Sequence, residues 1–280
     1  MAEATDHLSD SLLLRWRGCL TVTASVQQRL ELLSGGVLML LLGSLPFVSR
    51  NGLGLEIAAT GLLWLLWSLI TPAERIGAIS RWVLLYLAIA LVSTGFSPVP
   101  LAAAKGLLKL ASYLGVFGLM RTLLERKIIW WDRLLAALLG GGLLSSVLAL
   151  RQLYASTEEL AGWADPNSVS AGTIRIYGPL GNPNLLAGYL LPLVPLACIA
   201  VLRWRRLSFR MVAAVTALLA GIAILFTYSR GGWLGLLAGL ALAGLLLLLR
   251  STAHWPPLWR RLLPLGALVV GGIVLALAIT

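Results

Sequence analysis

The sequence contains little charge. Only 12% of its 280 residues are Asp, Glu, Lys or Arg, whereas hydrophobic residues make up 59%. Soluble domains carry a charge on roughly a quarter of their residues. The shortage of charge excludes an ordinary soluble domain and indicates a membrane protein.

Cysteine and histidine are almost absent. Cys19 and Cys198 lie far apart, with no CxxC motif and no Cys/His pairing, and the two histidines are His7 and His254. No P-loop, dinucleotide fingerprint or nucleophile elbow occurs. We therefore expect no metal site and no cofactor, and the sequence identifies no catalytic residue.

Acidic residues are few beside basic ones, and the net charge is +11. No segment is both basic and polar, so we expect no nucleic-acid binding and instead place the basic residues on the cytoplasmic face of a membrane. With the N-terminus in the cytoplasm, 16 of the 22 basic residues fall on the inner side. The charge asymmetry therefore predicts a cytoplasmic N-terminus.

Long apolar runs are abundant. A run of about 18 or more apolar residues can cross the hydrocarbon core as a helix, and only helices satisfy the backbone of such a run there. We expect an all-α fold, a polytopic transmembrane helix bundle of about nine spans. The expected spans are 30–48, 52–71, 78–96, 101–120, 133–153, 184–202, 211–228, 231–249 and 264–280.

Residues 1–29 are expected to form a cytoplasmic N-terminal segment, and residues 30–280 a transmembrane domain with an outer loop at 154–183. The stretch "LSDSLLLRWRGCL" fits either a helix on the inner membrane surface or a frayed tail. An odd number of spans would end the chain at the outer face without a polar flank. We therefore expect it to be truncated at its C-terminus.

The outer loop ends in "RIYGPLGNPNLLAGYL". A helix start explains part of it: Asn182 can cap the next helix, Pro183 suits its first position, and Gly178 and Gly181 allow tight turns. Arg175 either reaches a lipid phosphate or binds an anion beside the free N–H groups expected at the start of that helix. In the second interpretation, Asn182 and Asn184 belong to the same anion site.

A second arginine follows in "FTYSRGGWLGL". Tyr228 and Arg230 stand at the outer end of one expected span, and Gly231 and Gly232 would turn the chain directly into the next. An arginine at this depth is costly, which makes it a functional candidate, and a guanidinium suits phosphate or carbonate-like oxygens. We predict that Arg175, Arg230, Asn182, Asn184 and Tyr228 form an anion site.

Two lysines stand near the outer end of another span. Lys105 and Lys109 are four residues apart and share one helix face. They can line the same anion site or reach lipid headgroups, and the sequence leaves both interpretations open.

These stretches carry a family resemblance. "RIYGPLGNPNLLAGYL" and "TYSRGGWLGL", with the order of spans, resemble the O-antigen ligase and polymerase superfamily of bacterial membrane proteins. "FSPVPLAA", "EELAGWADPNSV" and "PPLWRRLLP" are similar to the cyanobacterial IctB group within it, which is named for inorganic-carbon transport. The resemblance covers most of the chain and implies a multi-pass protein of the bacterial inner (plasma) membrane.

The resemblance implies two activities. For the IctB group the substrate is bicarbonate. In the ligase branch, two arginines contact the pyrophosphate of a polyprenyl-linked glycan, roles that would fall to Arg175 and Arg230, and a histidine in a later outer loop acts as base. This chain stops before such a loop. Bicarbonate transport is therefore the first expectation, glycan ligase or polymerase (glycosyltransferase) activity the alternative, and a non-catalytic membrane partner a third. Membrane lipids are the other expected partners.

Transport across a membrane requires particular structural features. A carrier should contain broken helices or polar groups near the membrane midplane. The sequence offers one such interruption, Gly140 to Gly142 with Ser145 and Ser146. Close packing of helices explains these small residues equally well.

Overall fold

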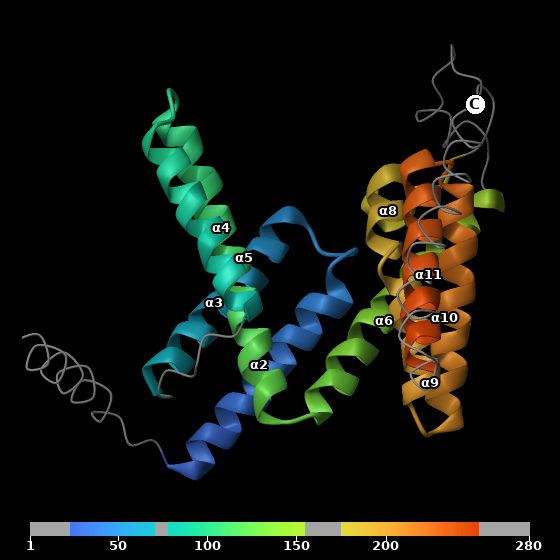
Figure 1. The fold of residues 1–280 in the computed structure, drawn as a ribbon, viewed down its shortest axis with the longest axis horizontal. Coiled ribbons are helices and arrows are strands. Elements are labelled where there is room, and N and C mark those ends of the chain that lie inside the picture. Colours follow the sequence, from blue (N-terminus) through green and yellow to red (C-terminus); the bar gives the residue numbers. More distant parts are fainter. Residues whose placement is uncertain (1–22, 71–77, 155–174, 252–280) are drawn as a thin grey trace, which may run out of the picture. The chain divides into compact units, whose positions relative to one another are not determined.

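This computed structural model describes residues 23–70, 78–154 and 175–251, and all regular structure in these ranges is helical (Figure 1). The chain divides into two compact units, Met1–Ala137 and Leu138–Thr280. Each unit is described by itself. The predicted surface segment before residue 23, the predicted span 264–280 and most of the predicted outer loop lie outside the described residues.

The first unit corresponds to the first four predicted spans. It contains the helices α2 (Ala24–Ser44), α3 (Arg50–Ile70), α4 (Ala78–Gly95) and α5 (Pro100–Arg126), and the start of α6 (Ile129–Arg151). Pro100 occupies the first turn of α5, where its missing N–H costs nothing. α5 continues six residues past its predicted end at Met120. The prediction ended there because charged residues follow, but these residues extend the helix.

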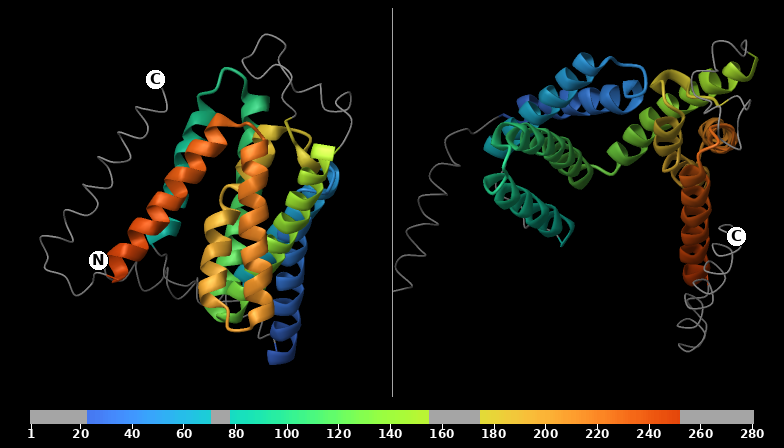
Figure 2. Two further views of the ribbon diagram at one scale, coloured as in Figure 1. Left: turned by 90° about the vertical axis from the view of Figure 1, so that its right-hand side faces the viewer. Right: turned by 90° about the horizontal axis from the view of Figure 1, so that it is seen from above.

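The second unit contains the rest of α6 and the remaining predicted spans that the structure describes. Its elements are η1 (Gln152–Tyr154), η3 (Gly178–Leu180), α8 (Pro183–Leu190), α9 (Leu193–Arg203), α10 (Leu207–Phe226) and α11 (Arg230–Ser251). α9 and α10 run antiparallel, and α11 turns back from the end of α10 (Figures 1 and 2). The starts of α8 and α11 and the end of α10 therefore meet at one end of this unit.

The helices fit a membrane protein. Six candidate spans among the described residues are long and apolar enough to cross a bilayer: α3, α5, α6 with η1, α8 with α9, α10 and α11. α4 is apolar but shorter, and α2 is not among the six. The all-α transmembrane class is thus supported, whereas the predicted count of nine spans is not confirmed.

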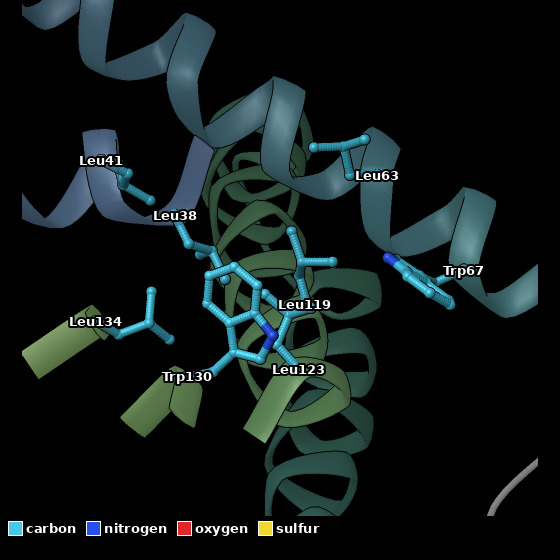
Figure 3. Close-up of a cluster of buried hydrophobic side chains, with 8 residues drawn as sticks. All are labelled: Leu38, Leu41, Leu63, Trp67, Leu119, Leu123, Trp130 and Leu134. Carbon is cyan, nitrogen blue, oxygen red and sulfur yellow. The ribbon is translucent and has the colours of Figure 1, made fainter. Parts of the chain in front are cut away.

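The core of the first unit surrounds Trp130. Its indole packs with leucines from α2, α3 and α5, including Leu38, Leu119 and Leu123, which are fully buried (Figure 3). The indole N–H donates to Glu31 at 2.9 Å, and Lys127 bridges the same carboxylate. A buried indole needs such a polar partner. The side chain is therefore fixed by both packing and hydrogen bonding.

Gly35 and Gly36 give a test of this packing. A Cβ at Gly35 would lie 2.0 Å from the Trp130 ring, whereas one at Gly36 would meet nothing within 4 Å. We expect Gly35→Ala to lower the free energy of unfolding by about 1–3 kcal/mol, the usual cost of overpacking. Gly36→Ala should leave it unchanged or raise it by about 0.5–1 kcal/mol, because alanine suits a helix better than glycine. Thermal unfolding of both variants in detergent distinguishes these effects, and equal melting temperatures would contradict the packing described.

Candidate anion site

Arg175 ties two helix ends together. Its Nε donates to the carbonyl of Thr227, just past the end of α10, at 2.9 Å, and its Nη2 donates to Oδ1 of Asn184 in the first turn of α8 at 3.3 Å. The next residue, Ile176, is fully buried and donates its N–H to Phe226. A cation at the carboxyl end of α10 is favourable, because the helix dipole is negative there.

Gln152 holds the chain that follows Arg175. Its Oε1 accepts the backbone N–H groups of both Tyr177 and Gly178, each at 2.9 Å. Gly178 and Gly181 have φ values of +54° and +69°, so the prediction that they form turns is confirmed. Sequence reasoning missed Gln152 because its partners lie 25 and 26 residues away and no local motif marks it.

Asn182 caps α8, as predicted. Its Oδ1 accepts from the N–H groups of Asn184 and Leu185, while its carbonyl accepts from Leu186. Pro183 has no N–H. The initial N–H groups of α8 are therefore all paired, and the prediction that this helix offers free N–H groups to an anion is wrong, because its own cap occupies them.

The turn between α10 and α11 differs from the one predicted. It consists of Thr227, Tyr228 and Ser229, and the left-handed residue is Tyr228 with φ +48°, while Gly231 and Gly232 already belong to α11. Gly232 serves packing instead, since a Cβ there would lie 2.9 Å from Ala187 on α8. The left-handed conformation is costly for a residue other than glycine. It is accompanied by a Tyr228–Trp233 ring contact at 6.0 Å.

Arg230 begins α11 with its side chain exposed. Ser229 caps this helix, accepting from Gly232 through its hydroxyl and from Trp233 through its carbonyl. Within the described ranges, the N–H groups of Arg230 and Gly231 donate to no residue, and the Arg230 guanidinium has no hydrogen bond or ion pair. The free helix N-terminus of the site is therefore that of α11.

The two arginines lie at the same end of the second unit. Arg175 contacts Thr227, whose Cα lies at most about 11 Å from that of Arg230, three Cα–Cα steps away. A guanidinium has five N–H groups, and Arg175 donates two of them to described partners. Three N–H groups of Arg175 and all five of Arg230 can thus still contact an anion.

The remaining predicted site residues have different positions. Asn184 contacts Arg175, and Tyr228 is exposed in the turn itself. Lys105 and Lys109 are exposed on α5 and belong to the first unit, which is described by itself, so their part in the site stays a prediction. Within the described ranges, no group of three or more His, Cys, Asp or Glu could hold a metal ion.

Comparison of the chain with protein-family models, curated proteins and solved structures finds no match. The resemblance to the O-antigen ligase superfamily and its IctB group therefore stays a prediction.

The Asn182 cap can be tested directly. We expect Asn182→Ala to lower the free energy of unfolding by about 1 kcal/mol, the usual effect of removing a helix cap. Asn182→Asp should retain stability, because a carboxylate accepts the same two N–H groups. Melting temperatures in detergent measure both effects, and an Asn182→Ala protein as stable as the parent would show that the cap contributes nothing.

Proposed function

We propose that the protein transports a small oxyanion, bicarbonate, across the bacterial inner membrane, and that Arg175 and Arg230 bind the anion at the outer surface. The observation that carries this proposal is the pair of guanidinium groups at one end of the second unit. Thr227 and Asn184 orient the guanidinium of Arg175, and that of Arg230 has no partner among the described residues. Guanidinium groups bind planar oxyanions through paired N–H donors.

The distribution of arginines supports the outer location. At the opposite end of the same helices, the turn between α9 and α10 and its flanks carry Arg203, Arg205, Arg206 and Arg210. Clusters of this kind mark the cytoplasmic side of membrane proteins. The end with two arginines is then the outer end, and the N-terminus is cytoplasmic.

A proline kink near the midpoint of one candidate span supports transport over glycan transfer. The span Pro183–Arg203 consists of α8 and α9, which meet at Leu191 and Pro192, and both residues keep right-handed helical dihedrals. Apolar segments interrupted by proline are a feature of secondary transporters. The sequence placed the interruption at Gly140 to Gly142 instead, where α6 is continuous, because small residues there serve close packing. A Cβ at Gly142 would lie 2.5 Å from Leu193.

Handling of a polyprenyl-pyrophosphate glycan is the second candidate. It is favoured by the exposure of Arg230 and Tyr228 at the end of the helices, where a lipid-linked ligand too large to cross the bilayer could reach them. The two candidates share the anion chemistry and differ in whether the ligand crosses the membrane.

Arg230→Ala tests the site. In proteoliposomes containing the full chain, at alkaline pH where bicarbonate exceeds dissolved CO2, we expect the variant to take up labelled bicarbonate at least about tenfold more slowly, the effect of losing about 1.4 kcal/mol of binding free energy. Arg230→Lys should recover part of the uptake, because it keeps the charge and loses the paired donors. Uptake is measured over short times against protein-free liposomes.

Arg250→Ala is the matched control. Arg250 is an exposed arginine at the other end of the same helix, α11, and its removal should leave uptake unchanged. Equal rates in the Arg230→Ala and parent proteins would overturn the site. Absence of uptake by the parent protein, together with Arg230-dependent binding of polyprenyl-pyrophosphate glycan, would establish the second candidate instead.

A further inference from the structure

The described part of the second unit that follows the outer loop contains arginines but no acidic residue. Residues 175–251 include no Asp and no Glu. Basic side chains of the first unit do have acidic partners, as in the ion pairs of Arg121 with Glu125 and of Lys127 with Glu31. The arginines in 175–251 have no such partner within this range. An anion from outside the range is needed to balance their charge.

Three of these arginines stand together at the turn between α9 and α10. Arg205 and Arg206 are exposed, and their side chains make no hydrogen bond or ion pair with the described residues. The backbone N–H of Arg210 donates to the Arg206 carbonyl at 3.1 Å, which brings the two residues one helical turn apart. Like charges at this spacing are destabilising. The turn therefore concentrates positive charge that the described part of the chain leaves unbalanced.

Arg210 is held in place and still has N–H groups to offer. Its Nε donates to the carbonyl of Val201, in the last turn of α9, at 3.0 Å. A guanidinium has five N–H groups, so four remain on Arg210 and all five on each of Arg205 and Arg206. Such groups bind phosphate oxygens through paired donors. The turn can thus contact a phosphate from three side chains.

The turn also lies at the boundary of two candidate membrane spans. One span ends at Arg203 and the next begins at Leu207. Leu202 and Leu207, on either side of the turn, are each 69% exposed. Trp204 and Phe209 form an edge-to-face pair with ring centroids 5.9 Å apart, and aromatic residues are enriched at the membrane interface. The positive charge of the turn is therefore bordered by exposed apolar side chains.

This combination fits a lipid better than a soluble anion or an acidic protein segment. A phospholipid brings a phosphate for the arginines and acyl chains for Leu202 and Leu207, whereas a soluble anion offers nothing to these leucines. A zwitterionic lipid balances its own phosphate with an ammonium group, so only an anionic lipid supplies the missing charge. Basic clusters next to membrane spans bind anionic headgroups. We propose that the α9–α10 turn binds an anionic phospholipid through Arg205, Arg206 and Arg210.

The experiment titrates the full chain in detergent with phosphatidylglycerol or with phosphatidylcholine and measures the melting temperature. We expect the melting temperature to rise and saturate with phosphatidylglycerol only, because a ligand of the folded state increases its stability. Arg205→Gln and Arg206→Gln should each weaken the apparent affinity about fivefold, and the double variant about 25-fold, the usual effect of basic residues at an anionic surface. Neither side chain has a described partner to lose, so both variants should fold.

Arg81→Gln is the matched control, because it removes the same charge outside the turn. Arg81 is exposed near the start of α4, has no partner among the described residues, and has no other basic residue within five positions. Its removal should leave the affinity for phosphatidylglycerol unchanged. An equal loss of affinity in Arg81→Gln and Arg205→Gln would show a general response to net charge and overturn the site, as would equal stabilisation by the two lipids.

Two further measurements separate the possible ligands. Inorganic phosphate at the concentration of the lipid should not stabilise the protein, and stabilisation equal to that by phosphatidylglycerol would assign the turn to a soluble anion. Stabilisation by polyglutamate but not by phosphatidylglycerol would assign it to an acidic protein and overturn the lipid site. The inference does not rest on bicarbonate transport: Arg230→Ala should lose uptake and keep the effect of phosphatidylglycerol.

Discussion

Hydrocarbon offers no partner to a backbone N–H or C=O group, and the polar contacts around the two arginines follow from this constraint. Around the arginines, side chains complete the helix ends. Asn182 caps α8, Ser229 caps α11, and Arg175 donates to the carbonyl of Thr227 after α10. The first N–H groups of α11 and the Arg230 guanidinium have no partner among the described residues. The candidate anion site therefore lies where the pairing of the helix ends around the arginines is incomplete.

This arrangement gives the two arginines different roles. Because Arg175 orders the end of α10 and the start of α8, its removal alters the local fold together with any ligand contact. Arg230 has no bond within the described part of the chain to lose, so its removal would act only on a bound anion. Arg175 is already held by its two partners and would lose little entropy on binding an anion, whereas the free Arg230 side chain would lose more.

The sequence predicted the features that local rules determine. Apolar runs located the described helices to within about six residues at each end, and Asn182 with Pro183 correctly marked the start of α8. Tertiary contacts decided the rest. Glycine was the default choice for the left-handed turn, yet Tyr228 adopts it while Gly232 approaches Ala187. Gln152 was missed because its hydrogen bonds span a long stretch of sequence, and the kink at Pro192 was missed because it interrupts an otherwise continuous apolar run.

The short helix α8 connects the arginines to the proline kink. It has eight residues, a length of about 12 Å, with the Asn182 cap at one end and the kink at Pro192 just past the other. Asn184, in its first turn, contacts Arg175, while Tyr189 lies at its far end. The Asn182 cap and the intrahelical bonds hold these eight residues in one regular segment. A ligand that shifted Arg175 would therefore act through Asn184 on the whole of α8 and on its packing against Gly232 of α11, because Ala187 contacts that glycine from the middle of the helix.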